Sequence, residues 1–386
     1  MSLNKIQATY QHQEDLALRS GDVLPGYQLA YETYGELNAE GSNAILLFHA
    51  LTGSQNATGH TEVVTDTGKR WNEECQEGWW SKFIGDGLAI DTSDYYIICA
   101  NYIGGCYGSS GPSSSLDSKD SFTTIPTAPL GSAFPRITMS DIVDSQLPLL
   151  KHLGISKLHA VVGCSIGGML CLSLATRYPE LTDKVLCIAS TLATSPLQKI
   201  LNLEQIMAIE GDENFSGGDY YATQPPLRGL ALARTIQHKT FFSLQTMESR
   251  AQSEVRPTEG SPLSWYKPQS SLESYMLHQG KKFVSRFDAN SYLRLLDAWQ
   301  QYDAPQEAGA SSDKDIFASC LNQNFLQFSI DSDVCFYPSD QKRIADALSA
   351  AGVPNRHITV SSDKGHDSFL LEPELYHSEI VKFFNE

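Results

Sequence analysis

The chain has 386 residues, enough for one large hydrophobic core and an inserted subdomain. Charged residues make up 19% of it and hydrophobic residues 41%, which is typical of a globular protein and not of a disordered one. The net charge of -17 opposes sequence-independent binding to nucleic acid or anionic lipid. No apolar run approaches the ~20 residues of a membrane span, so we expect no nucleic-acid or membrane partner.

Short apolar runs typical of buried strands alternate with segments of helical periodicity in the first half of the chain. Strands are expected at 44–48, 95–100, 158–162 and 184–189, and helices at 140–153 and 167–178. From about residue 195 the strand-like runs vanish and helical stretches dominate, such as 230–242 and 289–302. The alternation then resumes, with strands at 324–330 and 357–360 and helices at 338–351 and 373–384.

Continuous apolar strands that alternate with helices predict a mostly parallel, doubly wound sheet covered on both faces. The simplest architecture is therefore an α/β core interrupted by a helical insertion. The three parts expected are 1–194 for the first half of the core, 195–315 for the insertion and 316–386 for the second half of the core.

The start of the sequence lacks the apolar segment of a secretory signal, which favours a cytoplasmic protein. None of the eight cysteines forms a C-x-x-C pair, so free thiols are expected rather than disulfides. No His or Cys cluster has the spacing of a zinc site, and neither a metal nor a bound cofactor is implied.

The segment Gly163-Cys164-Ser165-Ile166-Gly167 matches G-x-S-x-G between an expected strand and an expected helix. This context resembles the nucleophile elbow of the α/β-hydrolase fold, where a strained turn presents the serine at the top of the sheet. A serine needs a base to become a nucleophile, and in this fold the acid and then the histidine follow later in the chain. Ser165 is therefore the candidate nucleophile.

Two acids and one histidine follow expected strands in the required order. His366, in Gly365-His366-Asp367, follows the strand at 357–360, and Asp333 or its rival Asp331 follows the strand at 324–330. His366 would take the serine proton, and the acid would hold the ring and stabilise its cation.

Acyl transfer also requires donors for the developing oxyanion. The expected donors are the backbone N–H groups of Ile166, directly after the nucleophile, and of Leu51, in the loop after the strand at 44–48.

Several blocks resemble the homoserine O-acetyltransferase family in order along nearly the whole chain. They are His49-Ala50-Leu51-Thr52-Gly53, Gly78-Trp79-Trp80, the glycine-rich loop 104–112, the elbow 163–169, Glu273-Ser274-Tyr275 with 279–283, Arg286-Phe287-Asp288-Ala289-Asn290-Ser291-Tyr292-Leu293, and Gly365 to Leu370. The family pattern Ser-Asp-x-x-Phe-x-Pro falls on 332–338 and favours Asp333 over Asp331.

The resemblance implies that acetyl-CoA acetylates Ser165 and that the hydroxyl of L-homoserine then takes the acetyl group in ping-pong order, on the way to methionine. It also implies a helical lid, and a homodimer formed through the lid helices. The homoserine carboxylate would be held by Arg234 and the amine by Asp367, with Thr52 lining the same pocket. A zwitterion needs one fixed cation and one fixed anion, and arginine can bind a carboxylate through two parallel bonds.

The sequence departs from the family pattern near the acceptor pocket. Phe241 stands where the family usually has a tyrosine, and Phe242 where a basic residue is common. Cys164, Ile166 and Leu170 differ from the usual elbow, and the segment 59–76 is longer than usual.

These departures leave alternatives open on the same fold. They are a succinyl donor, serine as the acceptor, a serine esterase in which water resolves the acyl-enzyme, and a non-catalytic binding module, against which the intact serine, acid and histidine argue.

Overall fold

The computed structural model describes residues 3–115, 128–253 and 263–386. Its centre is an eight-stranded sheet in the order β1-β2-β6-β3-β7-β8-β9-β10. The strands are β1 (Lys5–Ala17), β2 (Val23–Tyr34), β3 (Ala44–Phe48), β6 (Tyr96–Ala100), β7 (Ala160–Cys164), β8 (Lys184–Ile188), β9 (Asn324–Ile330) and β10 (Asn355–Val360). From β6 to β10 every pairing is parallel, whereas β2 is antiparallel to both of its neighbours. The predicted α/β fold with a mostly parallel sheet is confirmed.

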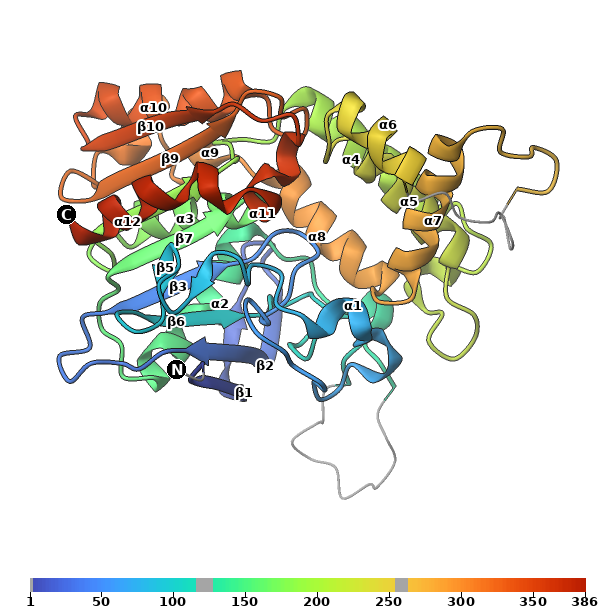
Figure 1. The fold of residues 1–386 in the computed structure, drawn as a ribbon. Coiled ribbons are helices and arrows are strands. Elements are labelled where there is room, and N and C mark those ends of the chain that lie inside the picture. Colours follow the sequence, from blue (N-terminus) through green and yellow to red (C-terminus); the bar gives the residue numbers. More distant parts are fainter. Residues whose placement is uncertain (1–2, 116–127, 254–262) are drawn as a thin grey trace.

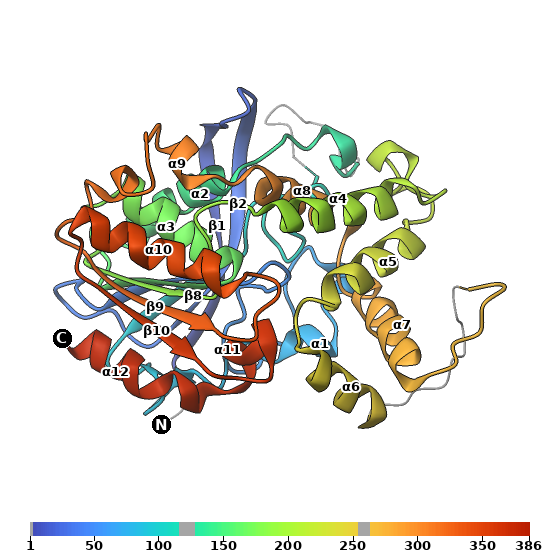
Figure 2. The ribbon, with the colours of Figure 1, turned by 90° about the horizontal axis from the view of Figure 1, so that it is seen from above.

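Helices cover both faces of this sheet (Figure 2). One face packs against α2 (Met139–His152), α3 (Ile166–Arg177) and α10 (Pro338–Ala351), and the other against α12 (His377–Asn385). Alternate residues of a strand serve the two cores: Leu46 lies in the first, and Ile45 and Leu47 lie in the second. Both cores are apolar, so the continuous apolar runs in the sequence follow from burial on both faces.

A helical layer stands beside the sheet, between β8 and β9 in the chain (Figure 1). It consists of α4 (Pro196–Glu210), α5 (Leu227–His238), α6 (Leu244–Ser253), α7 (Ser271–Val284) and α8 (Ala289–Gln301). The short α9 (Ala304–Glu307) follows α8 but lies over the sheet, where Glu307 accepts a hydrogen bond from Ser140 of α2. The entry to the helical layer is marked by a capping box in which the Ser195 side chain accepts from the Gln198 N–H and Gln198 bonds back, with Pro196 at the first helical position. We call α4 to α8 the lid.

Short elements complete the described chain: α1 (Glu73–Gln76), β4 (Ile84–Gly85), β5 (Ile90–Asp91) and α11 (Ser368–Leu371). Most expected elements are found within a few residues of their predicted bounds. The strand expected at 158–162 runs instead at Ala160–Cys164, and the helix expected at 373–384 begins only at His377, after a single 3-10 turn.

The N-terminal hairpin of β1 and β2 has no counterpart in the sequence-based prediction. β1 is largely solvent-exposed and carries few large apolar side chains, so no hydrophobic pattern reveals it. Tertiary contacts hold it in place: Lys5 of β1 pairs with the fully buried Glu32 of β2 at 3.0 Å.

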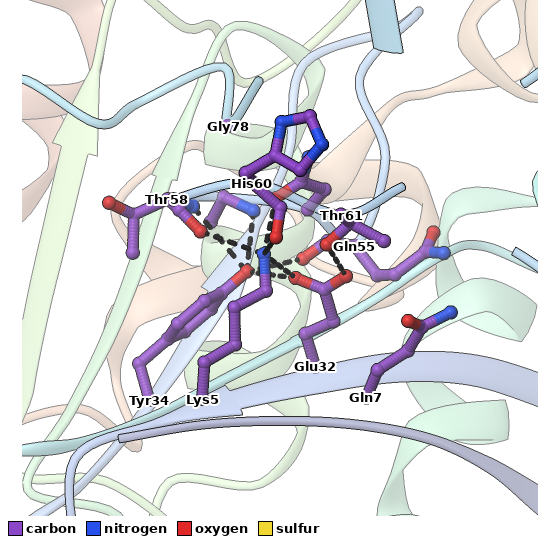
Figure 3. A network of polar contacts seen from close by, with 12 residues as sticks. Lys5, Gln7, Glu32, Tyr34, Gln55, Thr58, His60, Thr61 and Gly78 are labelled. Carbon is purple, nitrogen blue, oxygen red and sulfur yellow. Dashed lines mark hydrogen bonds and ion pairs between the residues drawn. The ribbon is translucent and has the colours of Figure 1, made fainter. Parts of the chain in front are cut away.

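Figure 3 shows that this ion pair continues into the loop that follows β3. Lys5 Nζ donates to Asn56 Oδ1 at 2.9 Å and to the Thr58 carbonyl at 3.0 Å. The Tyr34 hydroxyl donates to Glu32 and accepts from the Ala57 N–H at 2.7 Å. The hairpin thus ties down the loop that carries Leu51 and Thr52 at its start.

Candidate active site

Ser165 lies at the turn between β7 and α3 with φ 58° and ψ −127°. A non-glycine residue rarely takes this backbone conformation, and such strain is concentrated at functional sites. Gly167 allows the turn, because a Cβ there would lie 2.3 Å from the Phe48 carbonyl oxygen. The start of α3 can therefore touch the end of β3, which brings the loop after β3 next to Ser165.

His366 and Asp333 form a buried pair in which His366 Nδ1 lies 2.8 Å from Asp333 Oδ2. The other carboxylate oxygen accepts the N–H groups of Cys335 and Phe336 at 2.8 and 2.9 Å. Asp331, the rival acid, is exposed and accepts the Ser362 N–H instead. The structure thus pairs the histidine with Asp333 and not with Asp331.

Burial lowers the pKa of His366, but the charges of Asp333 and Asp367 and the hydrogen bond to Asp333 outweigh it and raise the pKa above its ordinary value. Among the described residues, no hydrogen bond joins Ser165 Oγ to the His366 ring. Such contacts commonly tighten only when substrate is bound.

Both expected oxyanion donors are available. The backbone N–H groups of Leu51 and Ile166 have no hydrogen-bond partner among the described residues. The Leu51 loop is held by His49, whose ring stacks on Tyr102 at 3.7 Å and whose carbonyl accepts the Tyr102 hydroxyl. Burial lowers the pKa of His49 to about 4, so that ring is neutral near pH 7 and adds no charge to the site.

Arg234 projects from α5 between two aromatic rings. Its guanidinium carbon lies 4.9 Å from the ring centroids of both Phe241 and Phe283. Burial, and then the neighbouring Arg286, lower the pKa of Arg234 to about 10, so the group stays charged near pH 7. Its Nη1 atom is buried and has no hydrogen-bond partner in the described part of the chain. A charged donor left unpaired inside a protein is costly, and a bound anion would satisfy it.

Asp367 adds a carboxylate near this cation. Burial raises the pKa of Asp367 to about 6, although His366 and Arg234 act to lower it. Its backbone N–H donates to the Phe241 carbonyl at 3.0 Å. The histidine loop and the lid therefore meet directly, and Gly365 permits this contact, because it has φ +64° and a Cβ there would lie 2.7 Å from the Ser243 nitrogen.

Phe241, where the family resemblance leads us to expect a tyrosine, lies between the catalytic histidine and Arg234. Its ring is stacked near the His366 ring at 6.3 Å between centroids and also lies under the Arg234 guanidinium. An aromatic face is kept at this position, whereas a hydroxyl is absent.

Thr52 lies in the loop after β3, and its carbonyl accepts from Arg286 Nη1 at 3.1 Å. The same nitrogen donates to the Tyr107 hydroxyl at 2.9 Å. The sequence predicts no role for Arg286 beyond its place in the block 286–293. A cation that bonds a backbone carbonyl more than 200 residues away leaves no local signal.

The described residues contain no group of three His, Cys, Asp or Glu side chains that could hold a metal ion. In the same part of the chain, no helix is long and apolar enough to cross a membrane.

Comparison with known proteins gives a consistent result. The sequence profile of the α/β hydrolase fold matches residues 43–373. Homoserine O-acetyltransferase of Natronomonas pharaonis is 39% identical over 367 residues, covering 93% of this chain and 87% of that protein. The enzyme of the same name from Moorella thermoacetica is 37% identical over 380 residues, covering 98% of this chain and 95% of that protein.

Solved structures of similar shape include two with different names. The crystal structure of homoserine O-acetyltransferase from Bacillus anthracis has a TM-score of 0.85 at 24% identity and covers 99% of this chain and 98% of that one. Esterase E22 has a TM-score of 0.84 at 23% identity, with 98% and 100% covered. At these identities the two structures bear on the fold alone.

Proposed function

This chain is a member of the homoserine O-acetyltransferase family of α/β hydrolase-fold acyltransferases, and we propose that it moves an acetyl group from acetyl-CoA to the hydroxyl of L-homoserine. The observation that supports homoserine as the acceptor is the buried Nη1 of Arg234, which has no hydrogen-bond partner among the residues that the structure describes. It lies beside the ring of Phe241, which in turn stacks near His366. A carboxylate would satisfy the cation within reach of the histidine.

The first half-reaction forms the acyl-enzyme. His366 takes the proton of Ser165 as Oγ attacks the thioester carbonyl, and Asp333 stabilises the imidazolium. The N–H groups of Leu51 and Ile166 receive the oxyanion of the tetrahedral intermediate. The intermediate collapses to acetyl-Ser165, and the thiolate of CoA leaves with the proton from His366.

The second half-reaction consumes the acetyl-enzyme. Arg234 binds the homoserine carboxylate and Asp367 the ammonium group, while Thr52 borders the same pocket. His366 takes the proton of the homoserine hydroxyl as its oxygen attacks the acetyl group, and then returns that proton to Ser165. In the product the hydroxyl has become an acetate ester, and acetate is a better leaving group than hydroxide for sulfur incorporation on the way to methionine.

The proposal includes the setting of the enzyme. All eight cysteines are free and buried, which suits the reducing cytoplasm. The lid offers a surface for a homodimer, because Leu197, Ile200, Leu203 and Met207 form an exposed apolar row on α4. No bound cofactor is part of this chemistry, with acetyl-CoA acting as a co-substrate.

Intact-mass spectrometry tests the reaction. Acetyl-CoA should add one acetyl group to the wild-type protein and none to Ser165→Ala. Homoserine should then clear the adduct faster than serine or water. An adduct that water clears, with no acceleration by homoserine or serine, would indicate an esterase. Faster clearance by serine than by homoserine would indicate serine as the acceptor, and an adduct formed only from succinyl-CoA would indicate a succinyl donor. An adduct on Ser165→Ala would overturn the covalent step.

A further inference from the structure

We infer that Arg70 binds a phosphate of the acyl donor in a cleft between the segment 59–76 and the lid. The inference rests on the proposed function, since it assigns the far end of the same donor. The cleft has a volume of about 200 Å³ and is bordered by Arg70, Tyr221, Pro226, Leu230, Phe287 and Asp288, among others.

Within residues 3–115, 128–253 and 263–386, the guanidinium of Arg70 has no anionic partner. Its only hydrogen bond within the described chain goes from Nη2 to Ser113 Oγ at 3.2 Å, and its Nε is buried without a partner. No carboxylate of the described residues forms an ion pair with it. A cation that is half-buried and unpaired, on the wall of an open cleft, is suited to an incoming anion.

The other charged group on this wall is already satisfied. The Asp288 carboxylate accepts the hydroxyls of Tyr220 and Tyr221 at 2.8 and 2.9 Å and the Ser291 N–H at 2.9 Å. Three neutral donors therefore stabilise the negative charge of Asp288, and Arg70 supplies the positive charge of the cleft. In a chain with a net charge of -17, a polyanionic donor needs such a local cation.

One layer of side chains, which belongs in part to the lining of the cleft, separates the cleft from Arg234. Leu230 lies on α5 one turn before Arg234, so the two residues share a face of that helix. The rings of Phe287 and Phe283 stack with 5.2 Å between their centroids, and the Arg234 guanidinium lies over the Phe283 ring. CoA carries its thioester and its phosphates at opposite ends of a long flexible arm, which matches a phosphate site set apart from Ser165 by this layer.

Residues that follow Arg70 in the chain also contact the lid. Asn72 Nδ2 donates to Ser285 Oγ at 3.1 Å, and Glu74 pairs with Lys282 of α7 at 3.0 Å. Figure 1 shows α1, which follows Arg70 closely, beside the turn from α7 to α8. These contacts hold Arg70 against the lid.

The test compares two donors, acetyl-CoA and S-acetylpantetheine, which has the same thioester and no phosphate. For each, the rate of acylation of Ser165 per unit donor concentration is measured in wild type, Arg70→Leu, Arg70→Lys and the exposed neighbour control Lys69→Leu. We expect Arg70→Leu to lower the preference for acetyl-CoA over S-acetylpantetheine by roughly tenfold, the effect of losing one hydrogen bond to a charged group. Arg70→Lys should keep most of the preference, and Lys69→Leu all of it.

Each other outcome has a distinct meaning. If wild type is acylated by neither donor, the proposed function fails. If wild type is acylated and Arg70→Leu keeps its preference, or slows with both donors equally while its melting temperature is unchanged, the phosphate site is refuted and the function stands. A change confined to the Michaelis constant for homoserine would instead assign Arg70 to the acceptor and would also overturn the inference.

Discussion

At the scale of single residues, two carboxylates, those of Asp333 and Asp367, act on the pKa of His366. Burial lowers its pKa, and Asp333 and Asp367 raise it to a net value above the ordinary one. A general base works only when it is neutral, so acylation should be lost as the pH falls through this raised pKa. Removing the Asp367 charge removes one of the raising effects.

Asp367→Asn should therefore shift the acid limb of kcat/KM for acetyl-CoA to lower pH. The donor half-reaction is the right readout, because the acceptor pocket does not enter it. Ser362→Ala, near the same loop, serves as a control that changes no charge. An acid limb that stays in place, or moves to higher pH, would show that Asp367 does not act on the histidine.

The choice between the two acids gives a second prediction. Asp333→Asn should lower acylation by roughly 10⁴-fold, because the amide no longer holds the histidine in the right tautomer or balances its cation. Asp331→Asn is the matched control and should stay close to wild type, since Asp331 is exposed and its carboxylate accepts only the Ser362 N–H among the described residues. Single-turnover acylation measures both, and a reversal of the two results would assign the acid to Asp331.

Arg234 and Phe241 give a third prediction, which concerns the binding of the acceptor. Arg234→Lys should raise the Michaelis constant for homoserine by about tenfold or more, because lysine lacks the paired donors and the flat surface that two phenylalanine rings now sandwich. Donor acylation should remain near wild type. Phe241→Tyr keeps the ring and adds a hydroxyl, and it should lower that Michaelis constant. An Arg234→Ala enzyme with unchanged acceptor kinetics would refute the pocket.

At the scale of elements, the N-terminal hairpin acts as a clamp on the loop after β3. Lys5 has only 14% of its side chain exposed, and Glu32 has none. Lys5→Met would leave the Glu32 charge buried and uncompensated, which should cost about 3 kcal/mol of unfolding free energy. Denaturant titration measures it.

Lys157→Met is the matched control for that loss. Its ion pair with Asp183 is exposed at 54% and 57%, so its removal should change stability by well under about 1 kcal/mol. Equal losses in the two variants would show that the buried pair contributes no more than a surface pair.

At the scale of the whole molecule, the apolar row on α4 leads to a prediction on assembly. Ile200 and Met207 of α4 are 54% and 64% exposed. We expect the protein to have twice the 42.5 kDa mass of one chain in solution. Ile200→Lys with Met207→Lys should yield monomers, because charges do not pack at an apolar interface.

Leu321→Lys is the control, since Leu321 is equally exposed but lies outside the lid. Light scattering during size exclusion gives the masses. A wild-type mass of 42.5 kDa, or a dimer that survives both lysines, would contradict an interface on α4.

The sequence by itself determined the parts of this protein that depend on neighbouring residues. Continuous apolar runs alternating with helical periods predicted the parallel sheet, because strands buried on both faces must be apolar throughout. The strand, the G-x-S-x-G turn and the helix around Ser165 are consecutive in the chain, so the elbow was visible as a pattern. The candidates for the acid and for the histidine were visible too, because each follows an expected strand in the chain order that the α/β-hydrolase fold requires.

Only the tertiary structure decided the features that join distant segments. Asp331 and Asp333 lie two residues apart after one strand. The family resemblance favours Asp333, but the spacing alone does not choose between the two acids, because the pairing depends on where a loop 33 residues later arrives. The hairpin is held by the buried Lys5 and Glu32 rather than by an apolar pattern. Likewise, Arg286 reaches Thr52, and Arg70 meets the lid, through contacts between segments far apart in sequence. Side-chain hydrogen bonds and ion pairs act over a few ångströms in space, and the chain brings such groups together only when it folds.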